Sequence, residues 1–441
     1  MKILFLVTAF YPEQAIGAVR ITKVVKFAVR AGHDVTVVSL PPPPWAMRDE
    51  TLRFRELDTI RWTSIPQSDF FCRFFQRARV AAVGNRSALE TDESGRARSL
   101  RSRCRSAAQF LYTLLKAIDW TIQIRRYARH SLFGERFDAI FTSYPSFASP
   151  FAGVMLKCMN RSRCLMIDFR DPVTYGRTRP WSARRWIERW LLGHARFVSF
   201  ASVGVQTKVV GAIRGILPTQ RVVPNGFDPD DVLALEPIDV DDATGRMLHF
   251  AYVGSLYGGK RDLSPFFGAL AEAVGRSANP VHRFVIHYAG LEGDIFRSQA
   301  DRHGLGTHVR DHGRISRRCA LGLLRAVDIC LVSTWNTPDD QGILTGKVFE
   351  FFMLRKPVLA VVNGSLPNSE LRRIISETGA GFCYEEAASG EMPAFVEWLR
   401  ARLREKAETG RVDVRYTTRV SDYDFHQLCD GLFESIAQVL R

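Results

Sequence analysis

Several features are missing from this 441-residue sequence. No apolar run reaches the roughly 18 consecutive residues that a membrane span needs, so we expect no transmembrane helix. The first run, MKILFLVTAFYP, is short and no small-residue cleavage site follows it, which predicts a buried strand rather than a signal peptide. No short-period repeat is present. We expect a soluble protein, or one attached to a membrane only peripherally.

Cysteine is sparse and unclustered. The eight cysteines form no C-x-x-C pair, no histidine cluster lies near them, and several fall in apolar runs such as LRAVDICLVST. A cysteine in such a run is usually a small core residue. We therefore expect reduced thiols in a cytoplasmic protein, and no metal site.

Acidic residues are outnumbered, and the imbalance is local. The chain has 61 Lys and Arg against 46 Asp and Glu, a net charge of +15, and residues 73–136 alone hold 14 basic and 5 acidic residues. Residues 79–106 are polar and Arg-rich, which predicts an exposed or mobile loop. Such an excess suggests an anionic partner, but no recognised nucleic-acid-binding module is present, so nucleic acid is not expected.

Residues 107–130 predict a basic amphipathic helix. It mixes apolar and basic side chains, namely Phe110, Leu111, Leu114, Leu115, Ile118 and Trp120 with Arg125, Arg126 and Arg129. One interpretation places residues 110–129 on an anionic membrane surface. The other is an ordinary domain helix, whose apolar face joins the core while its charges stay in water.

Strand-like runs alternate with helical patterns in both halves of the chain. The runs are KILFLVTAF, DVTVVSL, TIRWTSI, FDAIFTSY, CLMIDFRD and RFVSFAS, then MLHFAYVG, HRFVIHYAG, AVDICLVST, KPVLAVV and GAGFCYEE. This alternation predicts an α/β protein with two Rossmann-like, doubly wound domains that face a cleft. Residues 217–247 are rich in Pro, Gly and Asp and mark the join. The predicted domains are 1–220 and 221–410, and 411–441 contribute a C-terminal helix that packs across them.

Candidate site residues in the second half follow the predicted strands, where open α/β sheets bind ligands. Glycines in the loop from Gly254 to Arg261 let amides approach phosphate oxygens, although a plain strand-to-helix connection is the alternative. Ser316 is a predicted helix cap, and Thr345 caps a helix whose first turn contains Glu350. The Glu350 carboxylate suits a cis-diol; the alternative is a simple partner of the helix dipole.

In the first half, candidate residues also follow strands. They are Gly17 and Arg20, the Ser143-Tyr144-Pro145 turn, and Arg170 and Asp171 of DFRDP. Because all of them fall at strand ends, the two halves would line one cleft. The alternative for each is a structural turn.

Together these segments resemble the GT-B glycosyltransferases, specifically retaining family GT4 and its bacterial enzymes of cell-surface polysaccharide or lipid-linked oligosaccharide synthesis. The resemblance spans nearly the whole chain. It is carried by Gly17 and Arg20, GHDVTVVS at 32–39, DFRDP at 168–172, VPNGFD at 223–228, VGSLYGGK at 253–260, Gly313-Arg314-Ile315, and TGKVFEFFMLRKPVLA at 345–360.

The resemblance implies a nucleotide-diphosphate sugar as donor and a glycan or lipid-linked acceptor. Donor-binding residues would be Gly254, Ser255, Lys260, Arg261, Arg314, Ile315, Thr345, Gly346, Lys347 and Glu350. Of these, Lys260 and Lys347 would stabilise the leaving diphosphate without a metal or cofactor, and Glu350 would bind the ribose. Acceptor-binding residues would be Gly17, Arg20, Tyr144, Arg170 and Asp171.

Two positions depart from the family pattern. The first Glu of the family's E-x7-E motif falls at Gly342, with Asp339 or Asp340 as a candidate substitute. Ser255 stands where the family often has Arg, with Arg261 as a candidate replacement. The expected function is a retaining hexosyltransferase in the cytoplasm, on the inner face of the plasma membrane. The alternatives are a non-enzymatic GT-B scaffold and a nucleotide-sugar 2-epimerase.

Overall fold

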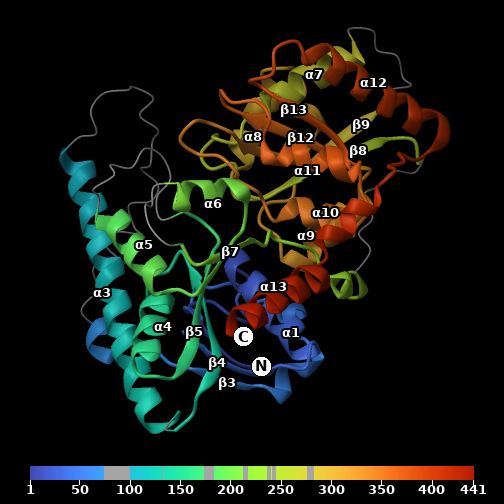
Figure 1. The fold of residues 1–441 in the computed structure, drawn as a ribbon. Coiled ribbons are helices and arrows are strands. Elements are labelled where there is room, and N and C mark those ends of the chain that lie inside the picture. The colour runs from blue at the N-terminus through green and yellow to red at the C-terminus, as the bar shows by residue number, and fades with distance from the viewer. Residues whose placement is uncertain are drawn as a thin grey trace.

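The computed structural model describes residues 1–73, 100–132, 134–172, 183–211, 217–235, 240, 245–275 and 283–441, without the side chains of 100–106 and 233–234. Two parallel sheets, each with helices on both faces, make up these residues (Figure 1). The predicted α/β fold with two doubly wound units is therefore confirmed.

The first sheet has the strand order β3-β2-β1-β4-β5-β6-β7, and all its strands are parallel. Its strands are nearly continuous apolar runs because helices cover both faces. The strands are β1 (Lys2–Val7), β2 (Asp34–Ser39), β3 (Arg61–Ser64), β4 (Phe137–Tyr144), β5 (Ser162–Phe169), β6 (Phe197–Phe200) and β7 (Thr219–Val222), and the helices α1 (Ile16–Arg30), α3 (Leu100–His130), α4 (Ala148–Cys158), α5 (Ala183–His194) and α6 (Val203–Val210).

The second sheet has the strand order β10-β9-β8-β11-β12-β13 and is parallel throughout. Its two faces carry separate apolar cores. The strands are β8 (Leu248–Val253), β9 (Phe284–Ala289), β10 (Val309–Asp311), β11 (Ile329–Trp335), β12 (Val358–Asn363) and β13 (Gly381–Glu385), and the helices α7 (Ser264–Val274), α8 (Gly293–Asp301), α9 (Arg317–Ala326), α10 (Lys347–Met353), α11 (Glu370–Thr378) and α12 (Met392–Thr409).

In each parallel sheet, the order in which successive strands are added reverses once. This reversal fixes where a ligand can enter. In the first sheet β1 lies between β2 and β4, and in the second β8 lies between β9 and β11. Loops that leave the carboxyl ends of such strands diverge and open a crevice. The candidate residue Gly254 lies in the loop after β8, and Gly17 lies in the first turn of α1, which follows the loop after β1.

Three local predictions are corrected. The short strands β7 and β10 were not predicted, because four and three residues give too little alternation to recognise. The predicted loop 79–106 is helical from Leu100 onward, where α3 begins; its residues 79–99 lie outside the described part of the chain.

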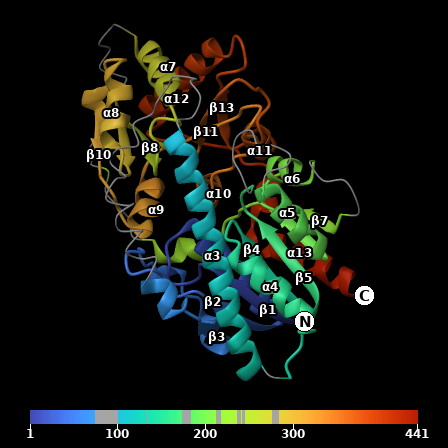
Figure 2. The same ribbon diagram turned by 90° about the vertical axis from the view of Figure 1, so that its left-hand side faces the viewer.

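The basic helix α3 belongs to the first domain's core (Figure 2). Ala117, Trp120, Ile124 and Ala128 are buried against that core, and the Trp120 indole donates to the Ile65 carbonyl at 2.9 Å. One face of α3 is thus an ordinary packing surface. Within the described residues, no helix is long and apolar enough to cross a membrane.

The C-terminal helix α13 (Phe425–Leu440) returns to the first sheet. Cys429, Leu432, Phe433 and Ile436 are buried in the core that α1 also covers, and Figure 1 shows the two helices side by side. The turn before α13 (Thr418–Tyr423) packs on the second sheet instead, through Tyr423. The domain limits of 220 and 410 stay predictions.

Candidate functional site

A pocket of about 510 Å³ lies between the two sheets, at their carboxyl ends. The start of α1, the segment 225–231, the ends of β8 and β9, and the starts of α9 and α10 line it. Eight predicted site residues are in the lining: Arg20, Gly254, Ser255, Arg314, Ile315, Gly346, Lys347 and Glu350. The pocket therefore brings together predicted residues that lie up to 330 positions apart in the chain.

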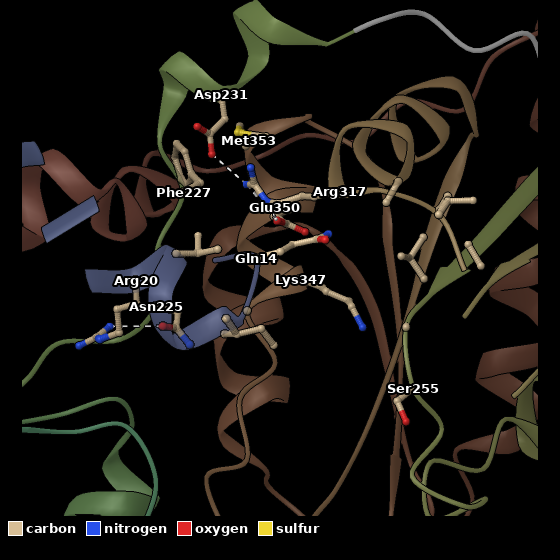
Figure 3. A pocket seen from close by; sticks show the side chains of 18 of the residues that line it. Gln14, Arg20, Asn225, Phe227, Asp231, Ser255, Arg317, Lys347, Glu350 and Met353 are labelled. Atoms are coloured by element: carbon tan, nitrogen blue, oxygen red, sulfur yellow. Dashed lines mark hydrogen bonds and ion pairs between the residues drawn. The ribbon is translucent and has the colours of Figure 1, made fainter. Parts of the chain in front are cut away.

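At one end of the pocket, Glu350 is held by an arginine that the sequence analysis did not select. The Glu350 Oε1 accepts from Arg317 Nε at 3.2 Å, and Arg317 Nη2 also donates to Asp231 Oδ2 at 2.9 Å (Figure 3). Asp49 Oδ2 lies 3.9 Å from Arg317 Nη1. One guanidinium thus connects the second domain to Asp49 of the first and to the segment that joins them.

These carboxylates fix the charge of Arg317. Burial alone would lower the pKa of its guanidinium, but Glu350 and Asp231 outweigh burial and raise that pKa above its ordinary value. The Glu350 side chain keeps about a quarter of its surface open to the pocket, 25%. Glu350 is thus an oriented hydrogen-bond acceptor, which suits a diol, with Arg317 as its positioning residue.

Lys347 occupies the middle of the pocket (Figure 3). Burial, reinforced by nearby Arg261, lowers the pKa of its ammonium group to about 8. Among the described residues Lys347 has no ion-pair or hydrogen-bond partner. A Cβ on Gly254 would lie 1.7 Å from Lys347 Nζ, so only glycine leaves room for the lysine at this point of the loop. An ammonium group placed in this way is suited to bind an anion.

The Gly-rich loop after β8 is predicted to bind phosphate through its amides, but in the structure a carboxylate of the chain itself accepts from two of these amides. The Glu292 carboxylate, which precedes α8, accepts from Ser255 Oγ and from the amides of Leu256 and Gly258, each at 2.6 Å. Burial would raise the pKa of Glu292, but these donors outweigh burial and hold it below its ordinary value. These loop amides are therefore satisfied by the chain's own carboxylate.

Lys260 and Arg261 lie on the aromatic side of that loop, beyond the described lining of the pocket. Lys260 Nζ is 3.9 Å from the centre of the Trp335 ring and 3.6 Å from Asp340 Oδ2. Arg261 stacks on Tyr257 at 4.6 Å and donates to the Ser255 carbonyl. Both cations are engaged in the loop's own structure, and their contact with a diphosphate stays a prediction.

The predicted helix caps have different outcomes. Ser316 caps α9, because its Oγ accepts from the Cys319 amide, as predicted. The predicted Thr345 cap is wrong: α10 begins after Gly346, which has no side chain to supply a cap, and Thr345 is buried one residue earlier. The Val348 and Phe349 amides of this turn donate instead to the backbone carbonyls of Thr345 and Gly346, at 3.4 and 3.3 Å.

Arg20 is a structural cross-link at the edge of the pocket. Its Nε and Nη2 donate to both Asp168 oxygens at 3.1 and 2.9 Å, and its Nη groups donate to the carbonyls of Val223 and Pro224. A bidentate, buried pair of this kind fixes α1, β5 and the segment after β7 relative to one another. Its predicted contact with an acceptor stays untested.

Of the other predicted acceptor residues, Tyr144 lies in the core, whereas Arg170 lies near the start of α1. Tyr144 is 3% exposed and lies between Phe147 and Phe169, and burial raises the pKa of its hydroxyl. Arg170 lies instead against Gly17: a Cβ on Gly17 would fall 1.8 Å from Arg170 Nη1. Asp171 follows Arg170 at the end of β5.

The structure gives a steric reason for Gly342. This residue has φ +66°, and a Cβ there would lie 2.5 Å from the Cα of Gly204, across the cleft at the start of α6. The two backbones pack against each other, so a glutamate has no room in this arrangement. Of the candidate substitutes, Asp340 is paired with Lys208 at 3.1 Å.

A carboxylate reinforces the same contact. Glu370, at the start of α11, accepts from the amides of Val203 and Gly204 at 3.1 and 3.3 Å. It therefore satisfies the first turn of α6 from the opposite domain, where a negative charge is favoured by the helix dipole. The two domains are closed on each other at this point.

Comparison with solved structures identifies the architecture. A sucrose-phosphate synthase from Thermosynechococcus elongatus is 13% identical, with 100% of this chain and 99% of that chain covered and a TM-score of 0.59. An α,α-trehalose-6-phosphate synthase from Burkholderia multivorans is 12% identical over 100% and 99%, with a TM-score of 0.62. An E. coli trehalose-6-phosphate structure bound with UDP-2-fluoro glucose is 12% identical over 99% of both chains, at 0.60.

The chain has the GT-B fold. The likeness extends over essentially the whole of these glycosyltransferases, and it confirms the architecture that the sequence predicted. No protein-family model and no curated protein matches the sequence. Among the described residues, no group of three or more His, Cys, Asp or Glu side chains could hold a metal ion.

The Gly342–Gly204 contact predicts a specific effect of Gly342→Ala. The new methyl group would meet the Gly204 backbone, and the domains would separate at α6. We expect faster hydrogen exchange at the Val203 and Gly204 amides. The control is Gly245→Ala, which imposes the same positive φ (+65°) and a similar strain of about 1–3 kcal/mol, but has no neighbour within 4 Å. Equal exchange in the two variants would contradict the contact.

Proposed function

We propose that this chain is a retaining glycosyltransferase that transfers a sugar from a nucleotide-diphosphate donor. The observation that carries the proposal is the pocket between two GT-B domains, which contains an oriented carboxylate, Glu350, and an unpaired lysine, Lys347. The first is suited to a ribose diol and the second to a diphosphate. The neighbour bound with UDP-2-fluoro glucose supports this class of donor.

The donor would lie along the pocket in one direction. Arg314 and Ile315 line the end near Glu350 and would border the base, while Gly346 and Lys347 would meet the phosphates. Departure of the diphosphate would then be stabilised by the Lys347 charge, without a metal or cofactor. Because Gly342 replaces an acid, the donor sugar would be recognised by other groups than in most of family GT4.

The finer assignment also belongs to the proposal. The motifs DFRDP and TGKVFEFF favour family GT4 and a role in bacterial surface-polysaccharide synthesis, with a glycan or lipid-linked acceptor. Such enzymes work in the cytoplasm, at the inner face of the plasma membrane. A non-enzymatic scaffold and a nucleotide-sugar 2-epimerase are the alternatives.

The first test is titration with a panel of UDP, GDP, ADP and dTDP and their sugar conjugates, by calorimetry. We expect at least one nucleoside diphosphate to bind, and Glu350→Gln to weaken it about tenfold or more, since a hydrogen bond to a charged group is worth about 1.5–3 kcal/mol. The matched control is Glu434→Gln, an exposed position on α13.

The other outcomes of that titration would favour one of the alternative functions or contradict the assigned donor position. A chain that binds no nucleoside diphosphate would be a scaffold, and one that releases free 2-epimerised sugar would be an epimerase. If a nucleotide binds and Glu350→Gln binds it as the parent does, the assigned donor position is wrong.

A second prediction follows from the lowered pKa of Lys347. The lysine is charged below about pH 8 and neutral above it, whereas an ordinary lysine stays charged to pH 10. Affinity for a nucleoside diphosphate, which is fully ionised above pH 7, should therefore fall from pH 7 to pH 9. The fall should disappear in Lys347→Met. A parent affinity that does not change with pH would exclude Lys347 as the phosphate ligand.

The outer face of α3 supports the proposed membrane contact. Leu111, Ile118 and Ile122 are 56%, 49% and 44% exposed, and this stripe continues toward the exposed Arg125 and Arg129. Apolar side chains beside arginines are typical of helices that lie on anionic lipid. Figure 2 shows α3 on the outside of the first domain, where a bilayer can reach it.

Vesicle sedimentation tests this contact. The parent should bind vesicles that contain phosphatidylserine, and this binding should weaken as the salt concentration rises. Replacing Arg125, Arg126 and Arg129 by Gln should weaken binding tenfold or more, at about 1 kcal/mol per basic residue. The control replaces three other exposed arginines, Arg411, Arg415 and Arg419. Equal losses in both triple variants would indicate net charge alone and contradict a contact through α3.

A further inference from the structure

Arg170 differs from the other two enclosed arginines of the cleft. Arg20 is bound by Asp168, and Arg317 by Glu350 and Asp231. Arg170 donates only through Nε, to Ser143 Oγ at 3.0 Å and to the Tyr144 carbonyl at 3.2 Å. Within the described residues neither Nη group has a hydrogen bond or an ion-pair partner.

An unpaired guanidinium in this position is energetically unfavourable. Protein largely surrounds the Arg170 side chain, and burial lowers the pKa of its guanidinium below the ordinary value. A desolvated charge without a counterion is retained in proteins chiefly where a ligand supplies the partner. The Nε bonds meanwhile hold the group at the end of β4, and its Nη1 lies toward Gly17 of α1.

That direction leads to the start of α1. Arg170 Nη1 lies against the Cα of Gly17, in the first turn of this 15-residue helix. Ala15, the residue before α1, supplies no side-chain cap, and the first helical amides to find a carbonyl are those of Ala18 and Val19. The Ile16 and Gly17 amides thus remain free among the described residues, at the positive end of the helix.

The acidic side chains near Arg170 and the start of α1 do not pair with its Nη groups. Asp168 is taken up by Arg20 and Ser199. Burial raises the pKa of Glu13, while Lys116 and Arg170 oppose that rise, so Glu13 lies within electrostatic reach of Arg170 but forms no ion pair with it in the described structure. Burial is the largest influence on the pKa of the Arg170 guanidinium and lowers it, while Asp168, Asp171 and Glu13 oppose that effect without forming an ion pair with Arg170 in the described structure.

We propose that Arg170 and the first turn of α1 bind a phosphate group on the acceptor. Two Nη groups and two amides supply four donors, which match the oxygens of a tetrahedral phosphate and exceed those of a carboxylate. The position is on the acceptor side, because Ile16, one residue before Gly17, lies beside Gly346 and so separates Arg170 from the donor's phosphate end. This inference rests on the proposed transferase function and narrows its acceptor to phosphorylated sugars or sugars on a lipid phosphate.

The test measures phosphate binding with the donor site filled. Inorganic phosphate and pyrophosphate are titrated, by ³¹P NMR, into the full chain saturated with whichever nucleoside diphosphate it binds, or into the free chain if it binds none. We expect millimolar binding in the parent, a loss of about tenfold or more in Arg170→Gln, and a smaller loss in Arg170→Lys. Arg411→Gln, which removes an exposed charge, should bind phosphate as the parent does.

Gly17→Ala provides a second variant that keeps every charge. Its methyl group would displace the guanidinium from α1, so phosphate binding should fall here too, with the fold checked by circular dichroism. Preference for a hexose phosphate over a short-chain prenyl phosphate, or the reverse, then identifies the source of the phosphate.

Two results would overturn the inference. Phosphate affinity that is unchanged in both Arg170→Gln and Gly17→Ala removes the site. A loss of nucleoside diphosphate affinity in Arg170→Gln, as large as the loss for phosphate, assigns Arg170 to the donor instead. Neither result bears on the donor titration of the parent, whose failure would remove the transferase function itself.

Discussion

The ion pairs of Arg317 are the interaction on which the candidate site depends. This side chain is 11% exposed and connects Glu350 of the second domain, Asp231 of the joining segment and, at 3.9 Å, Asp49 of the first domain. A buried network of this kind contributes little net stability, because desolvation of the charges offsets their attraction. Its effect is geometric: the carboxylate of Glu350 has one direction, and that direction depends on the position of the first domain. The orientation of this carboxylate is thereby coupled to closure of the cleft.

Closure of the cleft depends on two glycines that have no side chain to keep the domains apart. Gly204 and Gly342 allow two backbones from opposite domains to touch, and Glu370 then satisfies the first amides of α6. A glutamate at position 342, which the resemblance to family GT4 predicts, is incompatible with this contact. The glycine at position 342 and the close approach of the domains are therefore one feature rather than two.

Periodicity was sufficient to predict most of the fold. Long apolar strands such as β4 and β5 have a clear signal, and the order of strands and helices fixes a parallel sheet. Strand ends then indicated where Gly254, Lys347 and Glu350 would meet. The sequence could not reveal Arg317 or Glu292, because nothing in the local pattern of either residue distinguishes an ion pair or a loop ligand from an ordinary surface charge. Thr345 was misplaced for a related reason: helix ends shift by one residue without changing the pattern.

The distribution of paired and unpaired cations separates scaffold from site. Arg20, Lys23, Lys26 and Arg317 all have carboxylate partners, and these pairs connect α1 to β5 and to the segment 228–231. Lys347 and Arg170 are partly buried, yet neither has an ion-pair partner in the described structure. The described structure thus leaves two cations without an ion pair near the first turn of α1, with Gly346, the neighbour of Lys347, beside Ile16 and Arg170 beside Gly17. A folded chain can pair such charges with its own carboxylates, as it does at Arg317. The two ligands proposed above would supply the negative groups that Lys347 and Arg170 lack, one to each side.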